Sequence, residues 1–151
     1  MQAIRHWSVR HAGLLERVYA LVEHALIAAG PMLARIGMAR LERPVAAVER
    51  GVKGLLFDCR MCGQCTLSST GMSCSMNCPK SLRNGPCGGV RQNGYCEVKP
   101  DMPCVWVEAW AGSRRMGKGG AIRNVQAAVD HRLIGRSSWL AVARGEHAKR
   151  K

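Results

Sequence analysis

The distribution of cysteine constrains the fold of this chain more than any other feature of its sequence. All eight cysteines of the 151 residues lie between Cys59 and Cys104. The same segment is rich in glycine and proline, so it cannot build a conventional hydrophobic core of its own. Disulfide bonds or a bound inorganic group must therefore organise it.

The N-terminal residues argue against disulfide bonds. Disulfides persist mainly in secreted proteins, and the first 24 residues, MQAIRHWSVRHAGLLERVYALVEH, lack the apolar run of a signal peptide. The longest charge-free apolar stretch near the N-terminus, residues 25–34, has about half of the ~20 residues that a membrane-spanning helix needs. We therefore expect a cytoplasmic protein with no membrane partner, whose thiols bind metal.

The spacing of the cysteines favours iron–sulfur clusters over zinc. Two residues separate Cys59 from Cys62, and two separate Cys62 from Cys65. Such a run can occupy three corners of one cubane cluster. Structural zinc sites usually take two cysteines from each of two separate pairs. Eight thiolates suffice for two [4Fe–4S] clusters, for two zinc sites, or for one of each.

We predict two [4Fe–4S] clusters, with zinc as the alternative. The first three cysteines are expected to share one site with a single remote cysteine, and the remaining four are left for a second site. All eight are candidate cofactor-binding residues and metal ligands: Cys59, Cys62, Cys65, Cys74, Cys78, Cys87, Cys96 and Cys104.

The residues before the cysteine segment predict helices. Apolar side chains recur at three- and four-residue steps between residues 14 and 36. We expect a boundary at Gly30-Pro31, because proline breaks the interior of a helix. A further helix is expected over residues 44–56, with one face formed by Val45, Val48, Val52, Leu55 and Leu56. We interpret the region as three helices packed on one another; the alternative is an apolar stripe that docks on a partner.

One β-hairpin is predicted within the cysteine segment. Asn93-Gly94 is a strong turn signal, and it lies between the short runs 90–92 and 95–98. The expected fold is thus a small α plus irregular, metal-organised domain. It has three parts: an N-terminal helical segment (1–58), a cysteine-rich module (59–110) and a basic C-terminal tail with short helices (111–151).

Within the tail, the glycine-rich residues 112–120 are typical of a flexible linker. Two short helices are expected after it. The first covers residues 121–134, and the second is capped by Ser137 or Ser138.

The positive charge of the chain is concentrated in this tail. The formal net charge is +13, of which residues 1–58 contribute +3, residues 59–110 contribute +2 and residues 111–151 contribute +8. Four thiolates around a metal core of about +2 leave about −2 at each site, so two sites make the cysteine module net negative. A zinc-dependent nucleic-acid-binding protein is therefore the less favoured alternative, also because aromatic residues for base stacking are few, and we expect no nucleic-acid partner.

The sequence holds no catalytic constellation. All five histidines lie outside the cysteine module, and Gly85, Gly88 and Gly89 do not follow a strand and open a helix as a dinucleotide-binding fingerprint requires. We expect no catalytic residue and no catalysis by the chain alone.

Two strings stand out in the cysteine module: KSLRNGPCGG at 80–89, which is specific, and CRMCGQC at 59–65, whose cysteine run alone would not be. With Cys78-Pro79 and residues 104–106, they resemble the methylenetetrahydrofolate reductase C-terminal-domain family. A weaker similarity continues through residues 132–140. One departure is Ser75, where the family pattern has proline after the preceding cysteine.

The resemblance implies a partner and a reaction. The reductase associated with this family is a flavin-bearing TIM barrel that reduces 5,10-methylenetetrahydrofolate to 5-methyltetrahydrofolate in folate one-carbon metabolism. The chain is too short for such a barrel, which needs about 250 residues. By resemblance it is an accessory iron–sulfur subunit of an oxidoreductase, which relays electrons to the catalytic subunit or docks on it, while the flavin lies on that subunit. An electron-donor protein is a second expected partner. The alternative is a structural zinc module of the same complex.

The resemblance also suggests roles for residues near the cysteines. Trp106 and Trp110, four residues apart, are expected on one face of a short helix, where they shield the cluster region from water; the alternative is that they bind folate. Lys80 and Arg83 are candidates to donate hydrogen bonds to cluster sulfurs or to attract an anionic electron-donor protein, with a solvated surface position as the alternative.

Overall fold

The computed structural model describes residues 2–145, and within them it contains five α-helices and no β-strand. The last six residues of the predicted tail, 146–151, lie outside the described residues. The predicted helical character of the N-terminal segment is confirmed. The elements are α1 (Gln2–Arg10), α2 (Ala12–Ile36), α3 (Met38–Phe57), the 3-10 turn η1 (Ser75–Asn77), α4 (Val105–Ser113), the 3-10 turns η2 (Gly119–Arg123) and η3 (His131–Leu133), and α5 (Ser138–Ala143).

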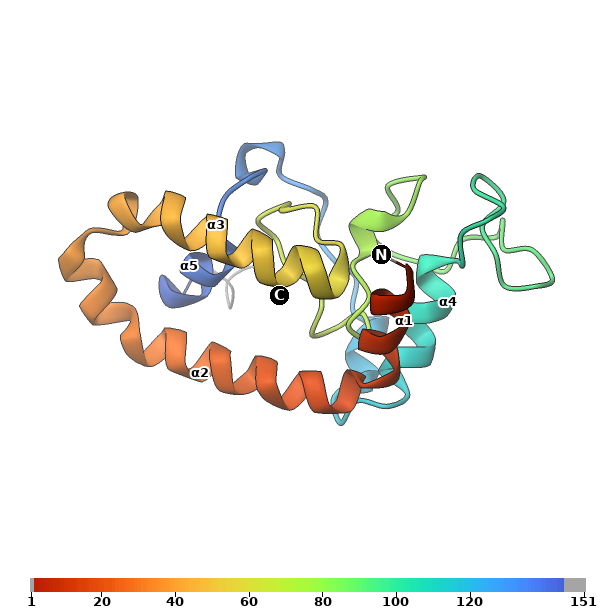
Figure 1. Ribbon diagram of the computed structural model, residues 1–151, viewed down its shortest axis with the longest axis horizontal. Helices are drawn as coiled ribbons and strands as arrows, with labels where there is room; N and C mark the ends of the chain where they lie inside the picture. Colours follow the sequence, from red (N-terminus) through yellow and green to blue (C-terminus); the bar gives the residue numbers. More distant parts are fainter. Residues whose placement is uncertain (1, 146–151) are drawn as a thin grey trace.

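The helices α2 and α3 run antiparallel and form a long hairpin (Figure 1). The predicted boundary at Gly30-Pro31 is wrong, because α2 continues through Pro31 to Ile36. Proline removes only one backbone donor, and the long apolar pattern on both sides of it keeps the helix intact. The chain turns instead at Gly37, whose φ of 105° is far more accessible to glycine than to other residues.

The helix α3 begins at Met38, six residues before the predicted start, and it buries a different face from the one expected. Its buried residues are Ala46, Glu49, Lys53 and Phe57. On the predicted face, Val48, Val52 and Leu55 are exposed, whereas Val45 and Leu56 are half-buried and Leu56 packs on the apolar core. The reason is that Lys53 and Glu49 neutralise each other and find hydrogen-bond partners inside the protein.

The short helix α5, near the end of the described chain, packs against both α2 and α3 (Figure 1). Ser137 caps it by accepting a hydrogen bond from the backbone N–H of Leu140 at 3.2 Å, as one of the two predicted caps should. Close contact with α2 is possible because Gly30 has no side chain: a Cβ at this position would lie 2.6 Å from the carbonyl oxygen of Ala143.

A small apolar core holds the cysteine module against the helices. Its buried members come from the start of α2, the end of α3, the loop after the first cysteines and the turn after α4, and two cysteines pack on its edge. These members are Ala12, Phe57, Leu67, Met72 and Met116, with Cys65 and Cys74 beside them. The module is therefore attached to the helices by apolar contacts as well as by polar ones.

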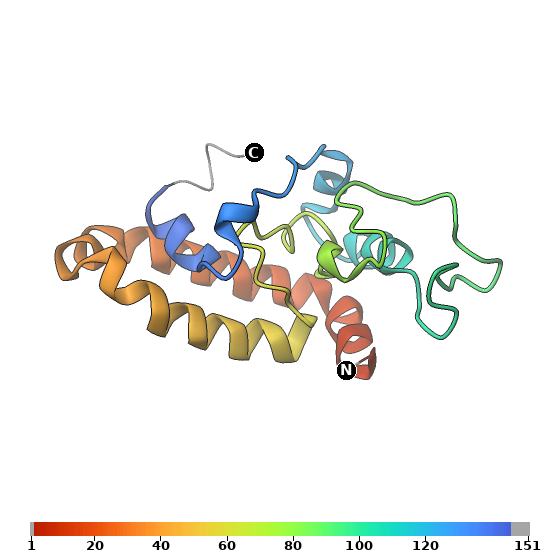
Figure 2. The same cartoon turned by 90° about the horizontal axis from the view of Figure 1, so that it is seen from above.

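The predicted β-hairpin is not formed as a pair of strands. The chain does turn at Asn93-Gly94, but only two isolated antiparallel bridges occur in the described residues, Val90 with Cys96 and Tyr95 with Pro103. The arms are short and the second is closed by proline, so they cannot extend the hydrogen-bond ladder. This loop lies at the end of the molecule opposite the α2–α3 turn (Figure 2).

The predicted linker at 112–120 and the predicted helix at 121–134 are also wrong. Gly112 and Ser113 belong to the buried last turn of α4, and Gly112 lies directly against the backbone of Gly71. Between α4 and α5, the chain forms only the separate 3-10 turns η2 and η3, joined by irregular backbone. The side chains and carbonyls of this irregular stretch are used to hold the cysteine loop.

Two glycine substitutions test the packing of α5 on α2. We expect Gly30→Ala to lower the free energy of unfolding by about 1–3 kcal/mol, because the added methyl group forces α2 away from α5. The matched control is Gly51→Ala in α3, where a Cβ meets nothing within 4 Å. It should raise stability by about 0.5–1 kcal/mol through helix propensity. Urea unfolding followed by circular dichroism measures both, and similar effects of the two changes would contradict the described packing.

Candidate metal centre

Four cysteines line one cavity between α3, the loop that follows it and the tail. Cys59, Cys62 and Cys65 come from the loop that leaves α3 at Asp58, a residue in the left-handed conformation with φ 51°. The fourth, Cys74, precedes η1 and reaches the same cavity. We call these four the first cysteine set. The structure thus places one remote cysteine with the run of three.

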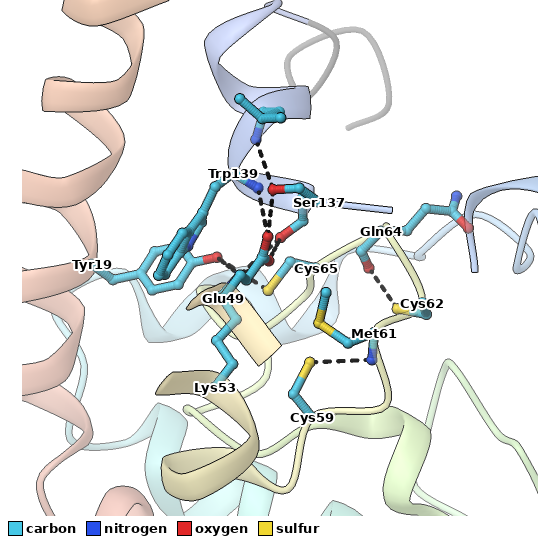
Figure 3. Close-up of polar contacts among 12 residues, drawn as sticks. Tyr19, Glu49, Lys53, Cys59, Met61, Cys62, Gln64, Cys65, Ser137 and Trp139 are labelled. Atoms are coloured by element: carbon cyan, nitrogen blue, oxygen red, sulfur yellow. Dashed lines mark hydrogen bonds and ion pairs between the residues drawn. The ribbon is translucent and has the colours of Figure 1, made fainter. Parts of the chain in front are cut away.

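Each sulfur of the first cysteine set has a hydrogen-bond donor beside it. The backbone N–H of Met61 donates to Cys59 Sγ at 3.4 Å (Figure 3). The backbone N–H groups of Arg60 and Met76 donate to Cys74. Donors aimed at sulfur stabilise thiolates and tune metal–sulfur groups.

Arg83 supplies a buried positive charge on one side of the cavity. Its Nη1 lies 3.9 Å from Cys62 Sγ, while Nη2 donates to the carbonyl of Gln64 at 2.8 Å and Nε to that of Ala127 at 2.7 Å. The side chain is buried. Of the two roles considered from the sequence, Arg83 therefore takes that of a donor to sulfur rather than that of a solvated surface residue.

Lys53 supplies a second buried charge on the other side. Its Nζ donates to Glu49 Oε1 at 2.7 Å and to Ser138 Oγ at 2.8 Å, and it lies 5.3 Å from the ring centres of Tyr19 and Trp139 (Figure 3). Only 1% of Lys53 and of Glu49 is exposed. The ion pair is thus fully enclosed by α2, α3 and α5.

Tyr19 connects this ion pair to the cysteines. Lys53 Nζ donates to the Tyr19 hydroxyl at 3.2 Å, and the hydroxyl donates to Cys65 Sγ at 3.1 Å (Figure 3). A continuous path of polar contacts therefore runs from Glu49 in the core to the sulfur of Cys65.

Burial and charge shift the pKa values of these groups in opposite directions. Burial raises the pKa of Tyr19 well above its usual range, so the phenol remains a donor. Burial lowers the pKa of Lys53, but Cys65, Tyr19 and Glu49 outweigh it, and the net pKa is raised. Burial raises the pKa of Glu49, yet Lys53 and the serine hydroxyls bring the net pKa below its ordinary value. The pair is therefore charged at neutral pH.

A hydrogen bond joins the side chains of Cys59 and Cys74. Their mutual hydrogen bond, with burial, raises the pKa of the Cys59 thiol. The same hydrogen bond lowers the pKa of Cys74, although burial opposes this. Cys74 is therefore the more acidic thiol of the two.

Comparison with known families identifies the chain. The family model described as methylene-tetrahydrofolate reductase C terminal matches residues 38–132. The chain belongs to this family. The match confirms the resemblance drawn from the cysteine strings, and it contains all eight cysteines as well as Lys53 and Arg83. Comparisons with curated proteins and with solved structures found no significant match.

The remaining cysteines of this family member lie around the start of α4, and we call them the second cysteine set. Cys104 is the residue before α4 and packs with Trp106, while Cys96 packs with the other side of the helix and Cys78 contacts both groups. Cys87 lies on the adjoining loop, where its sulfur accepts from the backbone N–H of Gly89 at 3.2 Å.

The expected partners of the second cysteine set are present in part. Trp106 is buried and Trp110 half-buried, and both pack in the apolar cluster that holds Cys104. The ammonium of Lys80 lies 3.5 Å from Cys87 Sγ and also pairs with Glu97. The side chains of Lys80 and Glu97 are both partly solvated. These contacts therefore give the second cysteine set no buried cation comparable to those beside the first cysteine set.

Three further observations concern the described residues as a whole. None of the eight cysteines forms a disulfide. Within residues 2–145, no group of three or more His, Cys, Asp or Glu side chains is arranged to hold a single metal ion. In the same part of the chain, no helix has the length and apolar character needed to cross a membrane.

Sequence reasoning missed Tyr19, Glu49 and Lys53 as site residues. The available signal was the spacing of Glu49 and Lys53, which are four residues apart on the line of α3 that also carries Ala46 and Phe57. Two opposite charges four residues apart can neutralise each other, so their position on a line of apolar residues indicates a buried ion pair. Tyr19 gave no such signal, because its contact with Cys65 depends entirely on tertiary packing.

Removing one partner of the buried ion pair tests how much the pair contributes to the stability of the fold. We expect Lys53→Met to lower the free energy of unfolding by about 3–5 kcal/mol, because the Glu49 carboxylate is left buried without a counter-charge. The double variant Lys53→Met/Glu49→Gln should recover most of the loss. Denaturant unfolding measures both variants.

The matched control is the exposed pair of Arg132 with Asp130. Arg132→Met should leave stability nearly unchanged, since solvent screens this pair. A Lys53→Met protein as stable as the wild type would show that the buried pair is not needed for the fold.

Proposed function

We propose that this chain is an accessory iron–sulfur subunit of a flavin-dependent methylenetetrahydrofolate reductase, which docks on the catalytic subunit and supplies it with electrons. The observation that carries the proposal is the convergence of the first cysteine set on one cavity, with a donor beside every sulfur. The family match supplies the reductase. The described residues contain no barrel strand, so the flavin and the folate belong on the catalytic subunit.

The side chains of the cavity fit a group with several thiolate ligands and a net negative charge. Free thiols would not need two buried cations beside them, and burying a charge is costly unless an opposite charge or hydrogen bonds compensate for it. Lys53 is paired with Glu49, whereas Arg83 is held only by carbonyls and by sulfur. The positive charge of Arg83 therefore favours an anionic group at the thiols.

We propose that the first cysteine set holds one [4Fe–4S] cluster and that the second set holds another. When bound, such clusters supply one-electron transfer at potentials that depend on burial and on hydrogen bonds to sulfur. The chain's own contribution is to fix the thiols, to exclude water with Trp106 and the apolar core, and to stabilise the thiolates with N–H and O–H donors.

An exposed face of the α2–α3 hairpin is the surface that we propose contacts the catalytic subunit. Apolar side chains follow one line on each helix, on the side opposite the buried residues, and both lines are open to solvent. They are Leu14, Val18, Leu21, Met32 and Ile36 on α2, and Val48, Val52 and Leu55 on α3.

The charges of the same helices suggest the chemistry of the partner surface. The exposed charged residues of α2 and α3 are basic, whereas their glutamates are buried or half-buried. The exposed basic residues include Arg17, Arg35, Arg40, Arg43 and Arg50. We therefore expect the catalytic subunit to present an apolar patch with an acidic rim.

Metal analysis of the full chain, purified without air, tests the cofactor. We expect brown protein with about eight irons per chain. Cys62→Ser should lose the cluster of the first set and leave about four irons, and Cys87→Ser should lose the other. Both variants should support the reductase less well than the intact protein does.

Two results would contradict the cofactor proposal. Colourless protein that contains zinc would favour a structural zinc module of the same complex. A metal-free or Cys62→Ser protein that supports the reductase fully would exclude electron transfer through the first set.

Introduction of negative charge on the apolar side chains of the hairpin tests the docking surface. We expect Leu21→Glu/Val52→Glu to weaken binding to the catalytic subunit at least tenfold, because both side chains are exposed, one on each apolar line (71% and 45%). The iron content and the helix content should not change. Binding is measured by calorimetry with purified catalytic subunit.

The matched control is Val125→Glu, at an 87% exposed valine in the irregular part of the tail. This variant should bind like the wild type. Unchanged binding by the double variant would exclude the hairpin face, and loss of self-association instead would identify a second copy of the chain as its occupant.

A further inference from the structure

Cys65 differs from the other members of the first cysteine set in the origin of its donor. Cys59 and Cys74 receive backbone N–H groups of their own loop, and Cys62 is beside a guanidinium of the module. Cys65 instead receives a phenol hydroxyl from α2, forty-six residues away in the sequence. The donor to this one sulfur therefore comes from outside the cysteine module.

The hydrogen bonds that Lys53 donates determine where the hydroxyl proton of Tyr19 points. An ammonium group has three donors and no acceptor, and Lys53 uses its three on Glu49, Ser138 and Tyr19. The Tyr19 oxygen thus accepts from Lys53, and its own single proton is left for Cys65. The result is a donor of fixed orientation, polarised by a buried positive charge.

The carboxylate of Glu49 does not cancel this polarisation at Cys65. Its Oε2 accepts from Ser137 Oγ at 2.6 Å and from the backbone N–H of Trp139 at 3.3 Å, both in the α5 region. The positive end of the ion pair is bonded to Tyr19, and the negative end is held by α5. The pair is therefore bonded to Cys65 through its cation and Tyr19.

We infer that Tyr19 and Lys53 are positioning residues that raise the reduction potential of the metal group held through Cys65. The inference rests on the proposed iron–sulfur function and goes beyond it by naming which residues set the potential of which site. An O–H···S hydrogen bond and a nearby buried cation both stabilise the more negative, reduced state of such a group. The second cysteine set has only the partly solvated Lys80, so its potential is set independently.

The variant that tests the inference is Tyr19→Phe in the full chain, purified without air. Phenylalanine fills the same space, and the change removes only the hydroxyl that connects Lys53 to Cys65. The iron and sulfide content should equal that of the wild type. In a redox titration followed by electron paramagnetic resonance, the midpoint potential of one cluster should shift to a more negative value, and that of the other should not change.

Two further variants make the test specific. Tyr95→Phe is the matched control: Tyr95 is the other tyrosine of the chain, and within the described residues its hydroxyl donates to no cysteine, so both potentials should equal those of the wild type. The double variant Lys53→Met/Glu49→Gln removes the polarising cation without leaving a buried charge. It should shift the potential of the same cluster in the same direction as Tyr19→Phe.

The outcomes separate this inference from the proposed function. Wild-type protein that contains zinc, or no iron, overturns both. Iron-loaded Tyr19→Phe protein with unchanged potentials overturns the inference and leaves the proposed function standing. Loss of iron from Tyr19→Phe overturns it as well, because Tyr19 would then hold the group rather than tune it, and an equal shift in Tyr95→Phe would show that the effect is not specific to the contact with Cys65.

Discussion

The buried ion pair of Lys53 and Glu49 is the interaction on which the rest of the structure depends. Its contacts reach α2 through Tyr19, α5 through Ser138, and the cysteine loop through the phenol that donates to Cys65. A buried pair of this kind contributes little net stability compared with an apolar replacement, but it enforces one arrangement, since every alternative leaves a charge without a partner. The charges thus specify how three helices and an irregular loop fit together.

The sequence predicted the fold where the signal was local. Helical periodicity identified the N-terminal helices, Ser137 was correctly offered as a cap, and the cysteine strings identified the family. The errors arose where tertiary contacts overrule local preference. Pro31 does not end α2, and the valine-rich face of α3 is not the core, because the enclosed ion pair turns the opposite face inward.

The cysteine module is also held by more than the sequence suggested. Its glycines and prolines indicated a segment that only an inorganic group could organise, yet the tail is bonded to it at several points. Gln64 accepts from the backbone N–H of Asp130 at 2.7 Å, the N–H of Gly135 donates to the carbonyl of Met61 at 2.7 Å, and Arg83 donates to Ala127. These partners lie in irregular backbone, for which no periodic pattern exists, so sequence reasoning could not identify them.

The position of α5 has a consequence for how the protein is made. Ser138 lies eighty-five residues after Lys53, in the last helix of the described chain. During synthesis the helices α2 and α3 and all eight cysteines leave the ribosome before Ser137 and Ser138, whose hydroxyls bond to Glu49 and Lys53. The wall of the cavity that Ser138 forms can therefore close only after α5 has emerged, and until then the thiols of the first cysteine set are open to the solvent on that side.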